Sequence, residues 1–558
     1  MMWIASVQPP SYVSIHSNIN LLECRVKKLM FFCVLCICQA WPAWAQNEDA
    51  SVNELLQQLT EARLKDMAPI LEQLEVEGGE ALLPLFHGLL AGDLYYLKSD
   101  HTLVSVTSVN GIDQYQEILS GHRIESLSKQ QISKVRVNNT LRGQLRQIIS
   151  RLQLNARQPD LRYTAVRSLL SELDADTMAT IRALYSGEQD QRVKAIMATA
   201  IALYSAESAQ DDNERVAAIG QLRNSLETDV RNALNRLAKD DTRPAVQSAA
   251  RRAVADIEQR VAWYGRLDQL FFGLSLGSVL LLAAIGLAIT FGVMGVINMA
   301  HGEMIMLGAY TTYVVQLLMP NAIDYSLWVA VPAAFMVSGL AGVLIERGII
   351  RFLHGRPLET LLATFGVSLI LQQLVRTVFS PLNRQVATPS WMSGSIELNP
   401  VLSLTLNRLY IFVFALLVFG LLLLILKKTS LGLNVRAVSQ NRDMARAMGV
   451  HTERVDALTF GLGSGIAGIA GVALSQLTNV GPNLGQSYII DSFMVVVFGG
   501  VGNLLGTLVA AFTLGVANKF LEPVTGAVLA SILVLVFIIL FIQKRPRGLF
   551  PQKGRAAE

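Results

Sequence analysis

The sequence predicts an all-α chain in which a polytopic α-helical membrane bundle, residues 269–558, follows a mostly helical soluble domain. The chain has 558 residues, of which 52% are hydrophobic and only 16% charged, against about 25% charged in a typical globular protein. The charges are divided unevenly, since residues 269–558 contain 18 Lys/Arg and 11 Asp/Glu whereas residues 1–268 contain 29 and 32. This composition excludes a disordered chain, a collagen, a disulfide-rich mini-protein and a wholly soluble enzyme.

Residues 1–45 are expected to hold a secretory signal behind an N-terminal extension. All four cysteines lie in the first 38 residues, and three of them fall in an apolar run without His or acidic neighbours, which disfavours a metal or redox site. Basic residues at 25–28, the apolar run 29–38 and Ala-Trp-Ala at 43–45 match the three parts of a signal peptide. We therefore expect translation to begin at Val26 and the chain to be exported from residue 46.

The exported domain, residues 46–268, is expected to be helical with a small β insert. Residues 51–76 carry apolar side chains at steps of three and four, which is typical of an amphipathic helix. Residues 94–137 contain Gly, Asp and β-branched residues, and 102–109 alternate as a strand does. We find no catalytic constellation here, so the domain is interpreted as a binding or scaffold element whose ligand stays open.

Short arginine-containing segments recur in the second part of this domain. Arg162, Arg192, Arg215 and Arg243 follow one another at intervals of 30, 23 and 28 residues. Repeats of this length favour stacked helix pairs like HEAT repeats. The irregular interval leaves an ordinary helical bundle open as the alternative.

The membrane domain is predicted to contain about eight spans. Seven apolar segments are long enough to cross a bilayer, namely 270–292, 299–318, 327–345, 358–379, 409–426, 456–476 and 526–543. An eighth, 491–518, is interrupted by Gly499–Asn503 and is expected to be broken or re-entrant. Basic residues gather in the loops 347–356 and 427–454 and after 544, which places these loops and the C-terminus in the cytoplasm and residue 268 outside.

Polar residues inside the spans indicate a solute path, because each is costly in lipid. The candidates are Asn298, His301, Glu303, Gln372 and Gln373. Hydrogen bonds that only hold helices together are the alternative interpretation, and His301 could pair with Glu303. No metal-binding motif, catalytic triad or carboxylate pair is present, so an intramembrane enzyme is not expected.

The predicted cytoplasmic loop 427–456 contains a segment, 436–450, that can form one short amphipathic helix. The residues expected to carry its function are Arg436, Arg442, Asp443, Met444, Ala445, Met448 and Gly449, with the glycine ending the helix. Such a helix can lie in a groove of another protein or at the lipid surface, and periodicity alone leaves both open.

Three segments resemble one known family. The stretch 286–310, with the core Phe-Gly-Val-Met-Gly-Val-Ile-Asn-Met-Ala-His-Gly-Glu, is similar to the opening signature of branched-chain amino-acid ABC transporter permeases. The loop 432–456 resembles the ATPase-contacting loop of that family, and the tail 545–550 resembles its end. Ala445 and Gly449 match the alanine and glycine that permease coupling loops share, whereas the acidic residue expected at the head of the loop is absent.

The resemblance implies a transport subunit of the bacterial inner membrane and not an enzyme. It implies a second permease subunit, identical or different, ATPase subunits beneath the pair and a periplasmic solute-binding protein above. The chain has no Gly-x-x-x-x-Gly-Lys-Ser/Thr phosphate loop, so the partner subunits are expected to use the ATP. We expect this chain to contact the lipid bilayer and to bind no cofactor, metal or nucleic acid.

The cargo is inferred from architecture. A large exported domain ahead of this membrane core resembles the permease subunit of urea ABC transporters. Urea would suit a narrow path lined by amide and carboxylate groups, because such groups replace its hydration. Branched-chain amino acids or short amides are the alternative cargo, and a passive urea channel or a membrane-anchored scaffold are alternatives of a different class.

Overall fold

The computed structural model describes residues 42–109, 112–118, 122–124, 131–353 and 355–550. The chain divides into two compact units, a front unit of residues up to 223 with 232–253, and a membrane unit of residues 224–231 with those from 254 on. This division falls inside helix α11 (Pro244–Met294), N-terminal to the predicted boundary at 268/269. The predicted signal segment lies outside the described residues except for its last four, which begin α2.

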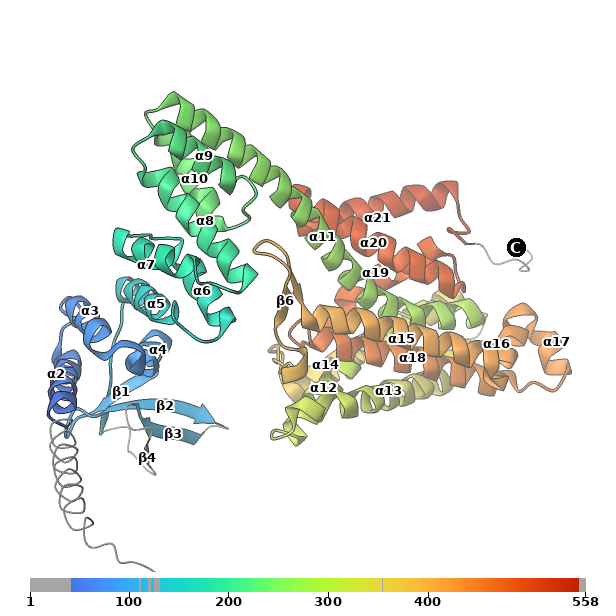
Figure 1. The fold of residues 1–558 in the computed structure, drawn as a ribbon. Coiled ribbons are helices and arrows are strands. Elements are labelled where there is room, and N and C mark those ends of the chain that lie inside the picture. The colour runs from blue at the N-terminus through green and yellow to red at the C-terminus, as the bar shows by residue number, and fades with distance from the viewer. Residues whose placement is uncertain (1–41, 110–111, 119–121, 125–130, 354, 551–558) are drawn as a thin grey trace, which may run out of the picture. The chain divides into compact units, whose positions relative to one another are not determined.

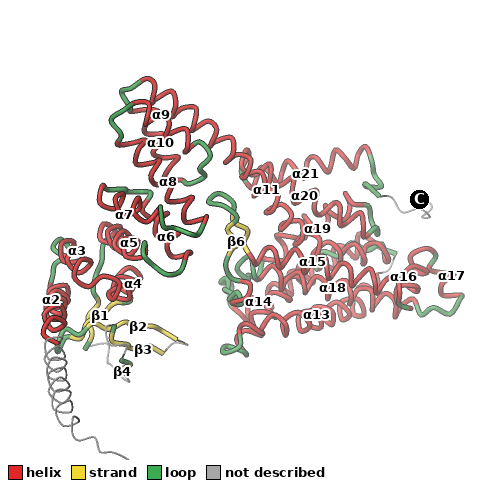
Figure 2. Tube along the Cα trace, viewed as in Figure 1, coloured by secondary structure: helices red, strands yellow, loops and turns green. Residues whose placement is uncertain are grey.

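The front unit begins with helices packed on a small sheet (Figure 1). These elements are α2 (Pro42–Glu61), α3 (Met67–Gly78), the 3₁₀ turn η1 (Gly79–Leu82), α4 (Leu83–Ala91), β1 (Leu94–Leu97), β2 (Leu103–Val109), β3 (Ile112–Glu117), β4 (Arg123–Ile124) and β5 (Ile132–Lys134). The strands form one antiparallel sheet in the order β4-β3-β2-β1-β5, drawn in yellow in Figure 2. The predicted β insert is therefore confirmed, and Leu71, Leu85 and Phe86 are fully buried in the core that the helices share with it.

Seven helices follow, of which the last continues into the membrane unit. They are α5 (Asn139–Gln153), α6 (Pro159–Leu169), α7 (Ala175–Tyr185), α8 (Gln191–Ser208), α9 (Asp212–Leu222), α10 (Thr228–Asp240) and α11. Helix α9 begins 53 residues after α6, α10 begins 53 residues after α7, and α11 begins 53 residues after α8. Buried positions recur at the same distance, as with Val166 and Ile219, or Val193 and Val246. The repeating unit is thus three helices, not the predicted helix pair.

Two of the four recurring arginines occupy the same position of this repeat. Arg162 bonds Glu188 at 2.8 Å, and 53 residues later Arg215 bonds Asp241 at 2.7 Å. Arg192 and Arg243 pair with residues of the preceding helices instead, at 3.2 and 2.8 Å. The intervals are irregular because Arg192 lies inside α8 whereas Arg243 precedes α11, so these two arginines do not share a position of the repeat.

The membrane unit is a helical bundle with one small hairpin. Its elements after α11 are α12 (His301–Leu318), α13 (Ile323–Gly348), η2 (Ile350–Leu353), α14 (Pro357–Phe379), η3 (Ser390–Met392), β6 (Ser395–Glu397), β7 (Ser403–Thr405), α15 (Leu406–Lys428), α16 (Ser430–Gln440), α17 (Arg442–Ala447), α18 (Thr452–Ser475), α19 (Leu484–Gly499), α20 (Leu504–Thr525) and α21 (Ala527–Lys544). Strands β6 and β7 pair antiparallel and were not expected from the sequence.

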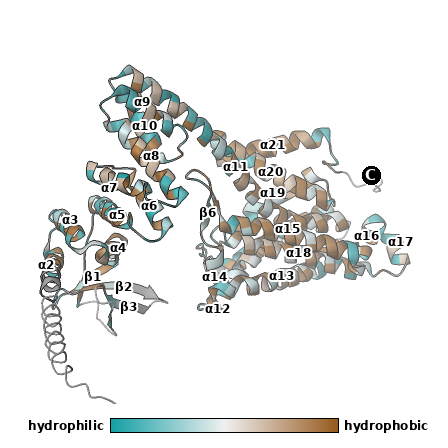
Figure 3. Ribbon diagram, in the orientation of Figure 1, coloured by the Kyte–Doolittle hydropathy of each residue, from teal (hydrophilic) through white to brown (hydrophobic). Residues whose placement is uncertain are grey.

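The predicted polytopic helical bundle is confirmed. In the described part of the chain, seven helices are long and apolar enough to cross a membrane, namely α11, α13, α14, α15, α18, α20 and α21. Helix α12, predicted as a span, is not among the seven because His301, Glu303 and other polar side chains lower its hydropathy. Figure 3 shows the hydrophobic colour concentrated on the helices of the membrane bundle and the hydrophilic colour on α16 and α17.

The break predicted at 499–503 is confirmed. Helix α19 ends at Gly499 and α20 begins at Leu504, so the segment 491–518 contains the end of a 16-residue helix and the start of a 22-residue one. The chain residues after α21 pack on this turn, where Leu549 and Phe550 donate backbone hydrogen bonds to the carbonyls of Phe498 and Gly499. Helices α16 and α17 lie at this same end of the bundle, and the β6–β7 hairpin lies at the opposite end (Figure 1).

Helix α18 is the centre of the bundle, and glycines set its spacing from its neighbours. A Cβ built on Gly308 of α12 would lie 2.0 Å from the carbonyl oxygen of Gly468, and one on Gly471 would lie 2.0 Å from that of Ile305. Gly463 meets Gly286 of α11 with the same closeness. Small residues at these positions allow backbone to touch backbone.

Candidate functional site

Two short helices cross inside the membrane unit and bring their first turns together. Helix α12 begins at His301 after a turn that contains Gly295 at φ 68°, a conformation that favours glycine. Gly302 in its first turn contacts Gly485 in the first turn of α19, where a Cβ would lie 1.8 Å from the carbonyl oxygen of Gly302. The crossing places Glu303 of α12 next to α14 and α19.

The side chain of Glu303 is the centre of a buried polar cluster, and only 1% of it is exposed. Its Oε1 atom accepts hydrogen bonds from Ser368 Oγ and from Gln372 Nε2, both at 2.8 Å. Gln372 Nε2 also donates to Gln486 Oε1 on α19 at 2.9 Å. Three helices therefore contribute to one network.

Glu303 Oε2 is left without a hydrogen-bond partner inside the bundle. A buried carboxylate oxygen without a partner is costly, and it accepts N–H or O–H donors from a bound molecule. The cluster therefore contains an acceptor atom without a partner, at the meeting of α12, α14 and α19.

Asn298 lies beside a second, largely apolar space. Its Oδ1 accepts the backbone N–H of Ala300 at 3.0 Å, which identifies Nδ2 as the donor atom, and Nδ2 has no partner although the residue is 1% exposed. The cavity that Asn298 lines has a volume of about 230 Å³. Its other walls are apolar and come from Leu287, Ile297, Met299, Leu361, Ile489, Ile490 and Phe493.

Two of the predicted path residues lie away from the cluster. His301 is fully buried, and its Nε2 donates to the carbonyl oxygen of Ala283 on α11 at 2.9 Å, so it joins two helices. His301 does not pair with Glu303, which was one possibility left open by the sequence, because Glu303 bonds Ser368 and Gln372 instead. The side chain of Gln373 is exposed, since successive residues of a helix point in different directions.

Ser368 and Gln486 were not predicted from the sequence. Ser368 lies four residues before Gln372 and so on the same face of α14, a spacing that would have revealed it. Gln486 lies in a segment predicted to be an outside loop, and only the tertiary structure brings it to the cluster.

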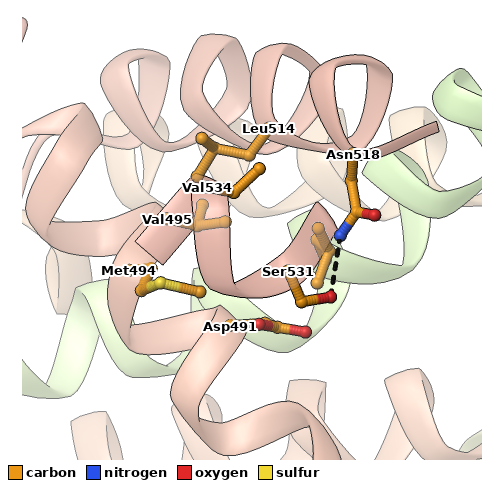
Figure 4. A pocket seen from close by; sticks show the side chains of 8 residues that line it. Asp491, Met494, Val495, Leu514, Asn518, Ser531 and Val534 are labelled. Atoms are coloured by element: carbon orange, nitrogen blue, oxygen red, sulfur yellow. Dashed lines mark hydrogen bonds between the residues drawn. The ribbon is translucent and has the colours of Figure 1, made fainter. Parts of the chain in front are cut away.

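A smaller polar group lies between α19, α20 and α21 (Figure 4). Asn518 Nδ2 donates to Ser531 Oγ at 3.3 Å, and the carboxyl group of Asp491 lines the same space. That space has a volume of about 10 Å³, which is about one water molecule. It is too small for a solute of several heavy atoms.

The predicted single helix at 436–450 is wrong, because the chain breaks at Asn441. Asn441 is extended, with φ −151° and ψ 105°, and its Oδ1 accepts the backbone N–H of Met444 at 2.9 Å. Asparagine favours this N-cap geometry over a helix interior. The loop therefore consists of α16 and α17, and Gly449 at φ 88° follows the end of α17 as predicted.

Side chains of this loop divide into a buried and an exposed set. Ala445 and Val438 are buried with Val435 and Val455 in a small apolar cluster. Met444 and Met448 are 60% and 80% exposed, as is Leu433 of α16 at 61%, and Asp443 is also exposed. The available apolar surface is thus the methionines and the leucine, not Ala445.

The basic residues of the loop bond within the membrane unit. Arg436 donates to the carbonyl oxygen of Leu426 at the end of α15. Arg442 forms a two-pronged ion pair with Asp456 of α18, and Arg446 donates to Thr452 Oγ1 at 3.3 Å. Among the residues that the structure describes, no three His, Cys, Asp or Glu side chains lie close enough to hold a metal ion.

Comparisons with known proteins match the membrane unit. The family model described as the branched-chain amino acid transport system permease component matches residues 269–542. The chain is 32% identical to the high-affinity branched-chain amino acid transport system permease protein LivH of Salmonella typhimurium, over 51% of this chain and 94% of that protein. It is 31% identical to the corresponding protein BraD of Pseudomonas aeruginosa, over 51% of this chain and 96% of that protein.

No solved structure matches the chain. The matches cover nearly all of LivH and BraD. The family model covers the helices that build the Glu303 cluster and the loop α16–α17. The chain therefore belongs to the branched-chain amino acid ABC transport permease family.

Proposed function

We propose that this chain is the permease subunit of an ABC importer whose cargo is urea. In this proposal residues 46–268 are periplasmic, the C-terminus and loop α16–α17 are cytoplasmic, and separate ATPase subunits drive alternating access. A second permease subunit and a periplasmic solute-binding protein complete the transporter.

The observation that carries the proposal is the free Oε2 atom of Glu303 in the buried polar cluster. Urea has four N–H donors and one carbonyl acceptor, all within a few ångströms. Glu303 supplies the acceptor for the N–H groups. Both N–H groups of Gln372 already bond to Glu303 and Gln486, so the amide nitrogen of Gln486 is the donor for the carbonyl oxygen of urea. Such a site replaces the hydration of urea without a permanent charge pair, so the solute can also leave.

A branched-chain amino acid is the second candidate cargo, and the cavity beside Asn298 favours it. Its aliphatic walls suit a leucine or valine side chain. The relatives LivH and BraD are named as transport proteins for such amino acids. Short-chain amides would use the same groups.

The loop α16–α17 supports the part of the proposal in which separate ATPase subunits drive transport. Its exposed Leu433, Met444 and Met448 offer an apolar surface at one end of the bundle, which fits a groove on an ATPase partner. The sequence has no phosphate-binding loop of its own.

Uptake of labelled urea and labelled leucine tests the proposal, in cells that lack only this chain and carry either the wild type or a variant. We expect energy-dependent urea uptake to be lost without the chain and leucine uptake to remain. Glu303→Gln should lower urea uptake about tenfold or more, because it removes a charged hydrogen-bond acceptor. Gln373→Ala is the matched control, since this neighbour of Gln372 is exposed.

Three results would change the proposal. Loss of leucine uptake instead of urea uptake would show that the cargo is an amino acid and not urea. Urea flux that persists without ATP would favour a passive channel. Unchanged uptake of both solutes would favour a scaffold.

A further inference from the structure

Helix α17 is connected to the core of the membrane unit by one buried ion pair. Arg442 Nη1 lies 3.3 Å from Asp456 Oδ1, and Arg442 Nη2 bonds Asp456 Oδ2. The Asp456 side chain is 4% exposed and that of Arg442 is 24% exposed. Two parallel bonds of this kind determine both the distance and the orientation between the two groups.

The other connections of α17 are weaker or local. The Asn441 cap lies within the loop itself. Arg446 makes one bond of 3.3 Å to Thr452 from an exposed position. The apolar contact is that of Ala445 with the cluster that includes Val455 of α18. The ion pair is therefore the main directional connection between α17 and α18.

Helix α18 carries any displacement directly into the solute site. Asp456 lies in its second turn, and further along the helix Gly468 and Gly471 touch the backbone of α12 near Gly308 and Ile305. Backbone contacts leave no flexible side chains to absorb a shift. Helix α12 carries Glu303, so α17, α18 and the polar cluster form one continuous set of contacts.

We propose that the Arg442–Asp456 ion pair is the positioning link that converts movement of α17 into movement of α18. This inference rests on the proposed function, in which an ATPase partner moves α16 and α17. Without the pair, ATP hydrolysis continues but solute is no longer transported in proportion to it.

The experiment compares ATP hydrolysis and solute uptake in proteoliposomes that contain the complete transporter. Asp456→Asn should keep ATP hydrolysis close to that of the wild type and lower solute moved per ATP about tenfold or more, a typical size for a coupling between two sites. The swapped pair R442D/D456R should restore most of the coupling. Arg351→Gln is the matched control, because its 2.9 Å pair with Glu453 is at the start of the same helix but half-exposed.

Each outcome separates the link from the proposed function. Absence of uptake by the wild-type transporter would contradict the proposed function and not the link. Normal solute moved per ATP in Asp456→Asn would overturn the link. Loss of hydrolysis and uptake together, with both restored by the swapped pair, would also overturn it, because the pair would then serve assembly.

Discussion

Replacing Gly308 by alanine should separate α12 from α18 and destabilise the membrane unit. The added Cβ would lie 2.0 Å from the carbonyl oxygen of Gly468 and 2.6 Å from its Cα. Heavy atoms in contact are normally about 3.5 Å apart, so the two backbones would have to separate by about 1.5 Å. Neither atom belongs to a side chain that could rotate away.

The magnitude follows from two opposing effects. Overpacking of a tight core costs about 1–3 kcal/mol, and the upper end applies here because backbone must move. Alanine recovers up to about 1 kcal/mol because it favours a helix more than glycine does. We expect Gly308→Ala to lose about 2 kcal/mol of unfolding free energy.

The control is a glycine in a membrane helix with free space around it. A Cβ on Gly366 of α14 or on Gly420 of α15 meets no atom within 4 Å. Alanine there should leave stability unchanged or raise it by up to about 1 kcal/mol. Reversible unfolding of the purified protein by SDS, followed by tryptophan fluorescence, measures all three variants. Equal stability of the Gly308 and Gly366 variants would refute the argument.

Further predictions concern the front unit and the exposed loop. Arg215→Ala should destabilise α9 by about 3–5 kcal/mol, because it leaves the Asp241 carboxylate buried without its ion-pair partner. Arg192→Ala breaks an exposed ion pair and should cost less than about 1 kcal/mol. Hydrogen exchange in the intact protein compares the two variants. The Arg162 guanidinium lowers the pKa of Glu188 to about 2 from 4.5. This ion pair therefore stabilises the fold above about pH 4.5 and loses its effect as the pH falls towards 2. Its contribution to the free energy of unfolding is about 1 kcal/mol after solvent screening. Glu188→Gln should therefore flatten the pH dependence of hydrogen exchange in α6 in that range, and an unchanged profile would contradict this. Met448→Glu should abolish co-purification of the ATPase while the bundle stays folded, and normal co-purification would exclude this surface as the contact.

Local patterns predicted most of the helices. The spans follow from runs of apolar residues, the break at 499–503 from its glycines, and strand β2 from alternation between 102 and 109. These properties depend on neighbours in the chain, so they can be read without a fold. The three-helix repeat is also present in the sequence. Its period of 53 residues was missed because the spacing was taken between successive arginines and not between Arg162 and Arg215.

The break at Asn441 shows where a local pattern was not enough. Apolar residues at helical spacing favoured one helix over 436–450, and the cap formed by the Asn441 side chain ended α16 instead. This cap turns Ala445 inward and leaves Met444 and Met448 outside. The break therefore divides the apolar residues of this segment into a buried and an exposed set.

The sequence alone predicted the helical class, with a membrane bundle behind a helical N-terminal region, and selected Glu303 as a candidate site residue. Only the tertiary structure decided which groups Glu303 meets, because Ser368, Gln372 and Gln486 reach it from helices far along the chain. It also assigned His301 to a helix contact and left Gln373 exposed. The physical reason is that a polar side chain in a membrane span costs free energy, so the sequence is enough to single it out. Its hydrogen-bond partner depends on how the glycine-rich helices cross, which is a property of the tertiary structure.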